Sequence, residues 1–307
     1  MTQLADQEVV FMIEKQAHLT GGFIGCGTQF ADSRIVVFGA PFDGTVTNRP
    51  GARYASSVVR AESHSIETYS PHLDMDLTDP GIAICDAGDL ELPFGAPWRV
   101  LEIIDNYVSG LYTAGKLPFM IGGEHLLTLG AVQAAARAYP NLSIAQFDAH
   151  ADLRADYIGE TLSHATVMRR CWDILGDSHI FQFAIRSGER HEFEFAEAHT
   201  FMGRFDFKKL DDAFQLEHLS PQNPVYLTID LDVLDPSECP GTGNPEAGGV
   251  SYAELLDAAR AIIMRCNVVG MDVVELCPPA DPSGISATLT CKLMRELLLM
   301  WAHSLHR

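Results

Sequence analysis

The sequence predicts a single α/β domain with a mostly parallel β-sheet that helices flank on both faces. Short apolar runs rich in β-branched residues alternate along the chain with longer segments of helical period. The short runs are apolar nearly throughout, as expected for parallel strands that are buried on both faces. Strand and helix repeat several times without an internal repeat, a low-complexity tract or an interdomain linker, so one domain is expected.

The expected strands are the short apolar runs. They cover residues 35–38, 82–85, 119–121, 143–147, 180–185, 225–229 and 268–274. In open sheets of this kind, ligands bind at the carboxyl ends of the strands. The residues that follow each run are therefore the place to search for a functional site.

Helices are expected between the strands. One of them has an apolar stripe and a glycine that is expected to end it; the stripe is formed by Val100, Leu101, Ile104, Tyr107, Val108 and Leu111, and the glycine is Gly115. Ser251 and Glu254 have the spacing of a capping box at the start of another helix. In a closing helix, apolar residues recur every four positions, at Ile285, Leu289, Leu293, Leu297 and Trp301.

Residues 1–30 are expected to form an N-terminal arm that packs on the domain or on a neighbouring subunit, and residues 31–307 are expected to form the main domain. The chain has 47% hydrophobic residues, enough for a substantial core. It has neither an apolar run of membrane-spanning length nor the basic and apolar start of a secretory signal, which predicts a cytoplasmic protein. Its seven cysteines are scattered and never spaced as CxxC, which argues against a disulfide framework and a thiolate zinc site.

The formal net charge of −20 argues against nucleic acid and anionic membranes as partners. It would attract a cationic substrate. A solvated acidic exterior explains most of these carboxylates equally well, so charge alone does not decide the function.

Acidic residues and histidines follow three of the expected strands. Alternate residues of an extended chain project to the same side, so Asp148, His150 and Asp152 are expected to converge on one point. Asp230 and Asp232 are expected to do the same from a second strand, and a further histidine follows a third. Carboxylates crowded in this way repel one another at neutral pH unless cations compensate them.

Two imidazoles and four carboxylates suit a pair of divalent ions that share bridging carboxylates. Oxygen-rich ligands without a thiolate favour manganese over zinc, although magnesium, cobalt and iron are compatible with the same ligands. An isolated DxD or a lone buried histidine usually has no metal. The run from Asp148 to Asp152 is more specific, because burying three ionisable groups in five residues has no structural benefit.

These motifs resemble those of the ureohydrolase family, which includes agmatinases, arginases and formiminoglutamases. The markers are GGEH at 122–125, DAHAD at 148–152, DLDVLDP at 230–236, PGTG at 240–243 and MDVVE at 271–275. The resemblance runs from about Phe38 to the C-terminus in order and spacing. It implies an arginase-like three-layer α/β/α fold and two manganese ions per subunit.

The resemblance implies a role for each matching position. The first ion is held by His125, Asp148, Asp152 and Asp230, and the second by His150, Asp148, Asp230 and Asp232. Glu275 pairs with the substrate guanidinium, His164 shuttles protons near the mouth of the site, and Thr242 and Gly243 frame the guanidinium pocket. Glu124 replaces the family's more common aspartate and Asn244 a usual threonine, and neither change removes an expected ligand.

The expected reaction is attack of a metal-bridging hydroxide on the guanidinium carbon, with Asp152 or His164 delivering a proton to the leaving amine. Agmatine, hydrolysed to putrescine and urea in polyamine biosynthesis, is the expected substrate. Guanidinobutyrate, guanidinopropionate and arginine are the alternatives. Asp156 and Glu160 are candidates to bind an ammonium tail, Arg154 would suit a carboxylate tail, and all three are equally well explained as ordinary loop charges.

Two other classes of protein are disfavoured. A metal-dependent deacetylase has a related fold but would use one zinc ion, a His-rich motif and a catalytic tyrosine, and the paired bridging aspartates argue against it. A regulatory protein on the same scaffold should have lost ligands, and all six are present. By resemblance to the family, a homo-oligomer, a trimer or hexamer, is expected.

Overall fold

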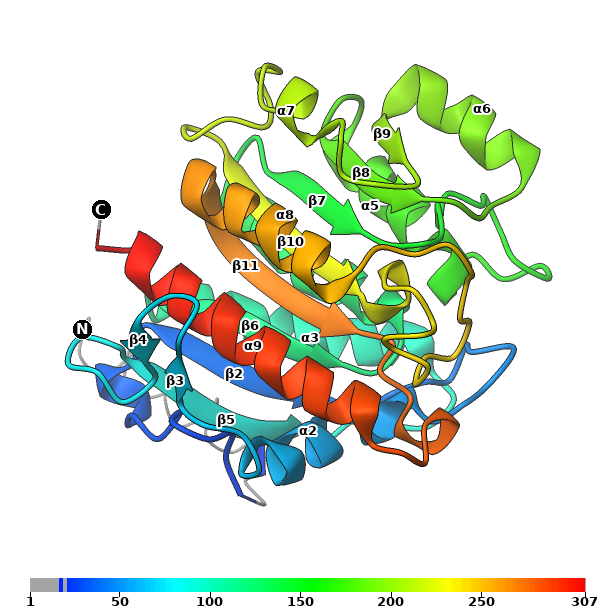
Figure 1. Ribbon diagram of the computed structural model, residues 1–307. Coiled ribbons are helices and arrows are strands. Elements are labelled where there is room, and N and C mark those ends of the chain that lie inside the picture. Colours follow the sequence, from blue (N-terminus) through cyan, green and yellow to red (C-terminus); the bar gives the residue numbers. More distant parts are fainter. Residues whose placement is uncertain (1–16, 19–20, 307) are drawn as a thin grey trace.

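In the computed structural model, which describes residues 17–18 and 21–306, the strands form one large sheet (Figure 1). The sheet has nine strands in the order β1-β5-β2-β6-β11-β10-β7-β8-β9, and neighbours are parallel except for β1 and β5. The strands are β1 Ala17–His18, β2 Ile35–Ala40, β5 Ile84–Leu90, β6 Leu117–Gly122, β7 Ser143–Phe147, β8 Ile180–Ile185, β9 Phe201–Arg204, β10 Pro224–Asp230 and β11 Asn267–Val274. A separate hairpin joins β3 Tyr69–Ser70 to β4 Met75–Asp76.

Helices cover both faces of the sheet, which confirms the predicted three-layer architecture. On one face lie α2 Ala55–Ser63, α8 Tyr252–Arg265 and α9 Ile285–Ser304, whose buried side chains share a hydrophobic cluster with the strands (Figure 1). On the other lie α3 Pro97–Thr113, α4 Thr128–Ala138, α5 Val167–Leu175 and α6 Arg190–His199, with a second cluster. The short helix α7 Leu210–Ala213 packs with the first cluster.

The predicted strands are all present, and one is displaced. Strand β5 begins at Ile84 and runs to Leu90, whereas the apolar pattern predicted a strand at 82–85. The strand continues through Asp86 and Asp89 because the buried guanidinium of Arg60 pairs with both carboxylates, at 2.8 Å from Nε to Oδ2 in the case of Asp86. The short edge strands β1 and β9 were not predicted.

The helix predictions hold with one correction. The stripe of α3 is buried at every predicted position, and Gly115 follows this helix with a φ of +69°, a left-handed conformation that suits a helix end. Ser251 and Glu254 form the predicted capping box of α8. In α9, Ile285 is 56% exposed, because it is the first residue of the helix and lies beyond the buried part of the stripe.

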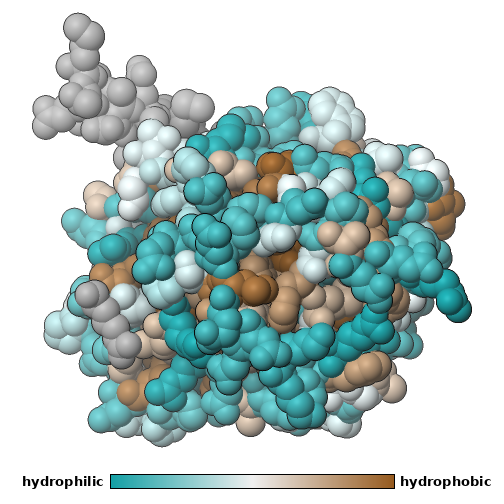
Figure 2. Space-filling view, turned by 90° about the horizontal axis from the view of Figure 1, so that it is seen from above, coloured by the Kyte–Doolittle hydropathy of each residue, from teal (hydrophilic) through white to brown (hydrophobic). Residues whose placement is uncertain are grey.

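The predicted N-terminal arm lies mostly outside the described residues, at positions 1–16 and 19–20. Within the described part of the chain, no helix combines the length and apolar character that crossing a bilayer requires. The face drawn in Figure 2 is largely hydrophilic, with apolar side chains gathered in small areas between polar ones.

The parallel strands bring their carboxyl ends to one edge of the sheet, where short 3-10 turns carry the predicted site residues. One such turn is His125–Leu127 after β6, and another is Leu231–Val233 after β10. Close approach of the segments that follow β2 and β6 requires glycine at position 123, since a Cβ there would lie 1.8 Å from the carbonyl oxygen of Phe42. Gly123 therefore lets the loop after β2 reach the same edge.

Candidate metal centre and active site

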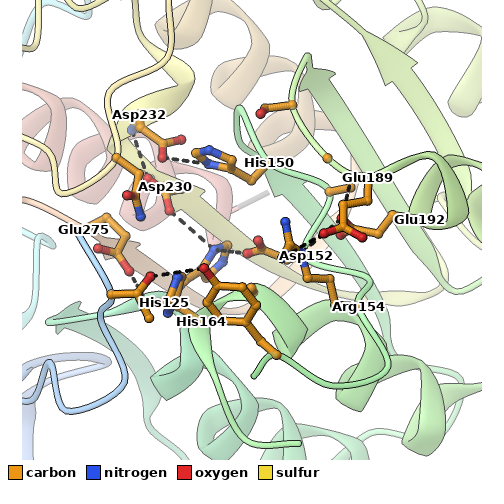
Figure 3. A pocket seen from close by; sticks show the side chains of 17 residues that line it. His125, His150, Asp152, Arg154, His164, Glu189, Glu192, Asp230, Asp232 and Glu275 are labelled. Carbon is orange, nitrogen blue, oxygen red and sulfur yellow. Dashed lines mark hydrogen bonds and ion pairs between the residues drawn. The ribbon is translucent and has the colours of Figure 1, made fainter. Parts of the chain in front are cut away.

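A cavity of about 270 Å³ opens at the carboxyl ends of β6, β7, β10 and β11 (Figure 3). Most of the predicted metal ligands line it: His125, His150, Asp152, Asp230 and Asp232. Asp148 is fully buried beside them. The structure thus brings together all six residues that were predicted from the sequence to bind metal.

The first group of ligand atoms surrounds the Nδ1 atom of His125. This atom lies 3.0 Å from Oδ2 of Asp148, 3.1 Å from Oδ2 of Asp152 and 3.5 Å from Oδ2 of Asp230. It is buried and has no hydrogen-bond partner among the described residues. Nε2 on the other side of the ring lies 2.9 Å from the hydroxyl of Thr228. A proton on Nε2 that is donated to Thr228 leaves the Nδ1 lone pair free for a cation.

The second group lies around His150. Its Nδ1 atom is 2.9 Å from Oδ2 of Asp232 and 3.7 Å from Oδ1 of Asp148. Asp148 belongs to both sets of mutually close ligand atoms, one with His125 and Asp230 and the other with His150 and Asp232. A carboxylate shared by two such sets is what a pair of neighbouring metal ions requires.

The crowded carboxylates of the site require compensating positive charge. Burial and the neighbouring Asp232 raise the pKa of Asp230 well above its ordinary value. Burial also raises the pKa of Asp148, but the neighbouring imidazoles of His125 and His150 outweigh it and hold that pKa well below the usual range. Carboxylates at such distances cannot all be ionised without compensating positive charge. The orphaned imidazole nitrogen and the oxygen-rich donors fit a bound divalent metal ion.

These titrations make the stability of the metal-free protein depend on pH. Burial and Asp148 raise the pKa of Asp152 to about 7, and burial and Glu124 raise that of Glu275 to about 8. Unfolded carboxyls titrate near pH 4. An acid whose pKa is higher in the folded state stabilises the fold below its unfolded pKa and loses this contribution as the pH rises through its folded pKa.

We therefore expect the melting temperature of the metal-free protein to fall between about pH 6.5 and 8. His164, whose pKa burial lowers to about 4, ceases to affect stability above its unfolded pKa of about 6.5. Added manganese should offset the fall, because the ionised carboxylates bind it more tightly. Thermal melts in chelator and in manganese measure both effects, and a metal-free melting temperature that rises across this window would contradict the expectation.

Glu275 immediately follows β11 and lines the cavity. Its side-chain Oε1 accepts a 2.7 Å hydrogen bond from the backbone N–H of His125. Its backbone has a φ of +65°, a strained conformation for a residue with a side chain and one that is concentrated at functional sites. A Cβ on Gly243 would lie 3.6 Å from Oε2 of Glu275, so the predicted framing loop abuts this carboxylate. The hydroxyl of Thr242 is buried and has no partner among the described residues.

His164 also lines the cavity, and the loop after β2 holds it in place. Its Nδ1 lies 3.0 Å from the carbonyl oxygen of Thr45, which can only accept, so Nδ1 donates and Nε2 is left as the acceptor. The Thr45 hydroxyl accepts from the backbone N–H of His164 at 3.1 Å and donates to Glu124 at 2.7 Å. In the sequence Glu124 stood out only as a departure from the family pattern, and in the structure it anchors the loop that holds His164.

The predicted tail-binding residues are placed differently from one another. Arg154 lines the cavity and pairs with Glu189 and Glu192, with Nη1–Oε1 and Nε–Oε2 distances of 3.3 and 3.4 Å. Asp156 and Glu160 are exposed, and the described residues that line the cavity do not include them. Glu189 and Glu192 were not predicted, although they follow β8 and the strand-end rule that led to the candidate metal ligands also directs attention to this segment.

Known proteins of one family resemble this chain in sequence and in structure. The model of the arginase family matches residues 33–300. An agmatinase of Bacillus anthracis is 44% identical over 280 residues, 91% of this chain and 96% of that protein. The N(1)-aminopropylagmatine ureohydrolase of Thermococcus kodakarensis is 34% identical over 260 residues, 83% of this chain and 87% of the relative. The solved structure of a candidate agmatinase from Clostridium difficile has a TM-score of 0.85 and 47% identity, covering 90% of this chain and 100% of that chain.

Proposed function

The chain belongs to the arginase family and is a hydrolase of guanidino carbon–nitrogen bonds, and on this premise we propose that it is an agmatinase that converts agmatine to putrescine and urea. The observation that carries the proposal is the 44% identity to an agmatinase over 91% of the chain. The acidic outer wall of the cavity, at Glu189 and Glu192, supports a substrate with a cationic tail.

We propose manganese as the metal, with two ions per subunit. His125, Asp148, Asp152 and Asp230 would hold one ion, and His150, Asp148, Asp230 and Asp232 the other. A pair of divalent ions, when bound, supplies hydroxide near neutral pH and Lewis acidity at the guanidinium. Oxygen-rich ligands without a thiolate support manganese over zinc.

The chain's own residues orient the substrate and move the proton. Glu275 pairs with the planar guanidinium and holds its carbon in line for attack. His164 is neutral at pH 7, because burial lowers its pKa to about 4, and its Nε2 accepts a proton at the mouth of the cavity. Asp152, or His164 through a water molecule, delivers the proton that the leaving amine needs.

The tail of the substrate lies toward the wall formed by Arg154, Glu189 and Glu192. Because Arg154 is already paired with both glutamates, its charge is compensated and does not favour a carboxylate tail. Glu189 is half exposed at its side chain and has room to receive an ammonium group. We propose Glu189, in place of the exposed Asp156 and Glu160, as the residue that meets the agmatine ammonium.

Urea release by the manganese-loaded protein on agmatine, arginine, guanidinobutyrate and guanidinopropionate tests this function. Agmatine should be preferred, and Glu189→Gln should raise its KM about 3- to 10-fold, since an exposed ion pair contributes on the order of 1 kcal/mol. Glu160→Gln is the matched control and should leave the KM unchanged. Preference for a carboxylate-tailed compound would contradict agmatine and make Arg154 the specificity residue, and no urea from any of the four would overturn the substrate class.

The remaining parts of the proposal follow from the activity. The reaction would belong to polyamine biosynthesis, in the cytoplasm, and the protein would act as a homo-oligomer, a trimer or hexamer. The partners would be a small cationic guanidino substrate and copies of the same chain, with no nucleic acid or membrane. The net charge of −20 supports this choice of partners.

A further inference from the structure

Two buried glutamines lie side by side beneath the metal-binding loop. Gln146 on β7 and Gln182 on β8 are register partners in the parallel sheet, and both are fully buried. Neither is a candidate ligand or lines the cavity. A primary amide is costly to bury unless its donors and acceptors are satisfied, so the contacts of this pair show what it does.

The two side chains form a relay of hydrogen bonds that ends on a metal ligand. Nε2 of Gln146 donates to Oδ2 of Asp148 at 2.6 Å. Nε2 of Gln182 donates to Oε1 of Gln146 at 2.7 Å and to the carbonyl oxygen of Ala151 at 2.8 Å. The hydroxyl of Thr200 donates to Oε1 of Gln182 at 3.1 Å.

The direction of the relay is set by the backbone. The carbonyl of Ala151 can only accept, so it must face the amide nitrogen of Gln182. The second hydrogen on that nitrogen then points to Oε1 of Gln146, which leaves the nitrogen of Gln146 facing Asp148. Turning either amide over would place two acceptors against each other, so the donor end always reaches the carboxylate.

The relay completes the fixation of Asp148. The other carboxylate oxygen, Oδ1, accepts from the backbone N–H of His150 at 2.6 Å, so both oxygens are held from outside the cavity. Asp148 is the residue common to both groups of candidate ligands. An amide holds it with a dipole alone, whereas a lysine or a protonated histidine at this place would add positive charge that competes with metal ions.

We propose that Gln146 and Gln182 are positioning residues that orient Asp148 for metal binding and so set the manganese affinity of the site. The proposal rests on the metal site of the proposed function and is independent of the substrate. Gln182 acts through Gln146 on the side chain of Asp148, and through Ala151 on the loop between His150 and Asp152.

Manganese binding to the metal-free protein, measured by calorimetry, tests the relay. Gln146→Leu removes the donor to Asp148 and should weaken manganese binding about 10- to 100-fold, the usual effect of losing a partner of a metal ligand. Gln182→Glu should weaken it similarly, because the introduced carboxylate offers only acceptors when ionised and turns the Gln146 amide over. Thr200→Val is the control and should bind within about twofold of wild type, since Ala151 still sets the direction.

A double variant separates the relay from general loosening of the fold. The effect of Gln182→Glu should shrink at least about twofold in the Gln146→Leu background, because the turned amide is no longer present. If Gln182→Glu does not fold, Gln182→Met, which removes both donors, carries the same expectation of weaker binding. Folded variants that bind manganese as tightly as wild type overturn the relay, whatever the turnover. Weakened binding in a protein that does not hydrolyse agmatine supports the relay and overturns the proposed substrate.

Discussion

Replacing Asp148 by asparagine is expected to lower kcat by at least about 10³-fold and to reduce the metal content of the purified protein. Asp148 is fully buried and is the carboxylate common to both groups of candidate ligands. Asparagine keeps the shape but removes the charge and replaces one acceptor oxygen by a donor. That donor would face the amide nitrogen of Gln146 or the backbone N–H of His150, both of which also donate. The variant therefore loses both attraction for the cations and the orientation of the side chain.

Metal analysis and steady-state urea release on the same preparation measure the two effects together. Asp211→Asn is the matched control, because the side chain of Asp211 is 88% exposed and pairs only with Arg265 among the described residues. It should retain full metal content and turnover. An Asp148→Asn protein with wild-type turnover would show that the carboxylate is not a ligand and would remove the basis of the two-metal proposal.

The candidate metal ligands could be predicted from the sequence because short-range rules place them. Asp148, His150 and Asp152 follow a strand that is apolar nearly throughout, and Asp230 and Asp232 follow another. Parallel strands bring such segments to one edge of the sheet whatever the details of the helices. Glu275 was identified by the resemblance to the family, and in the structure it also follows a strand, β11.

The rest of the site depends on contacts between segments far apart in the chain, which spacing does not reveal. Thr45 meets Glu124 and His164, 79 and 119 positions away. The acids of β5 interrupt an apolar pattern, and only the position of Arg60 shows why the strand continues through them. In the sequence Gln146 and Gln182 are ordinary polar residues in two strands, and only the register of β7 and β8 shows that they lie side by side.

Glu189 and Asp156 are two acidic residues of which only Glu189 lines the cavity. Asp156, like Glu160, was a candidate to bind an ammonium tail because it lies in the loop that follows the ligand motif. Asp156 does not line the cavity and instead accepts a hydrogen bond from the backbone N–H of Gly159 in an exposed turn. Glu189 follows β8, the strand next to β7 in the sheet, and lines the cavity. Adjacency in the sheet therefore decides the wall of the pocket more than adjacency in the sequence.

Replacing Glu275 by glutamine is expected to lower kcat/KM for agmatine by about 10²- to 10³-fold, since losing one partner of a buried charge pair costs roughly 3–4 kcal/mol. The substitution should weaken the interaction with the substrate without destabilising the fold. The glutamine oxygen can still accept from the backbone N–H of His125, as Oε1 of Glu275 does at 2.7 Å. Its amide nitrogen would then face the guanidinium, where a donor meets a donor. Manganese affinity, measured by calorimetry, should stay within about threefold of wild type.

The pH dependence gives this prediction a second signature. Burial and the neighbouring Glu124 raise the pKa of Glu275 to about 8, so the carboxylate becomes ionised as the pH rises. Bound cations lower that pKa again, so the rise in wild-type kcat/KM should be complete below about pH 8. Glutamine cannot ionise, and the Glu275→Gln variant should lose this part of the profile. Full activity of the variant, or an unchanged pH profile, would show that Glu275 does not pair with the guanidinium. The pairing depends on the negative charge of the ionised carboxylate, which glutamine lacks.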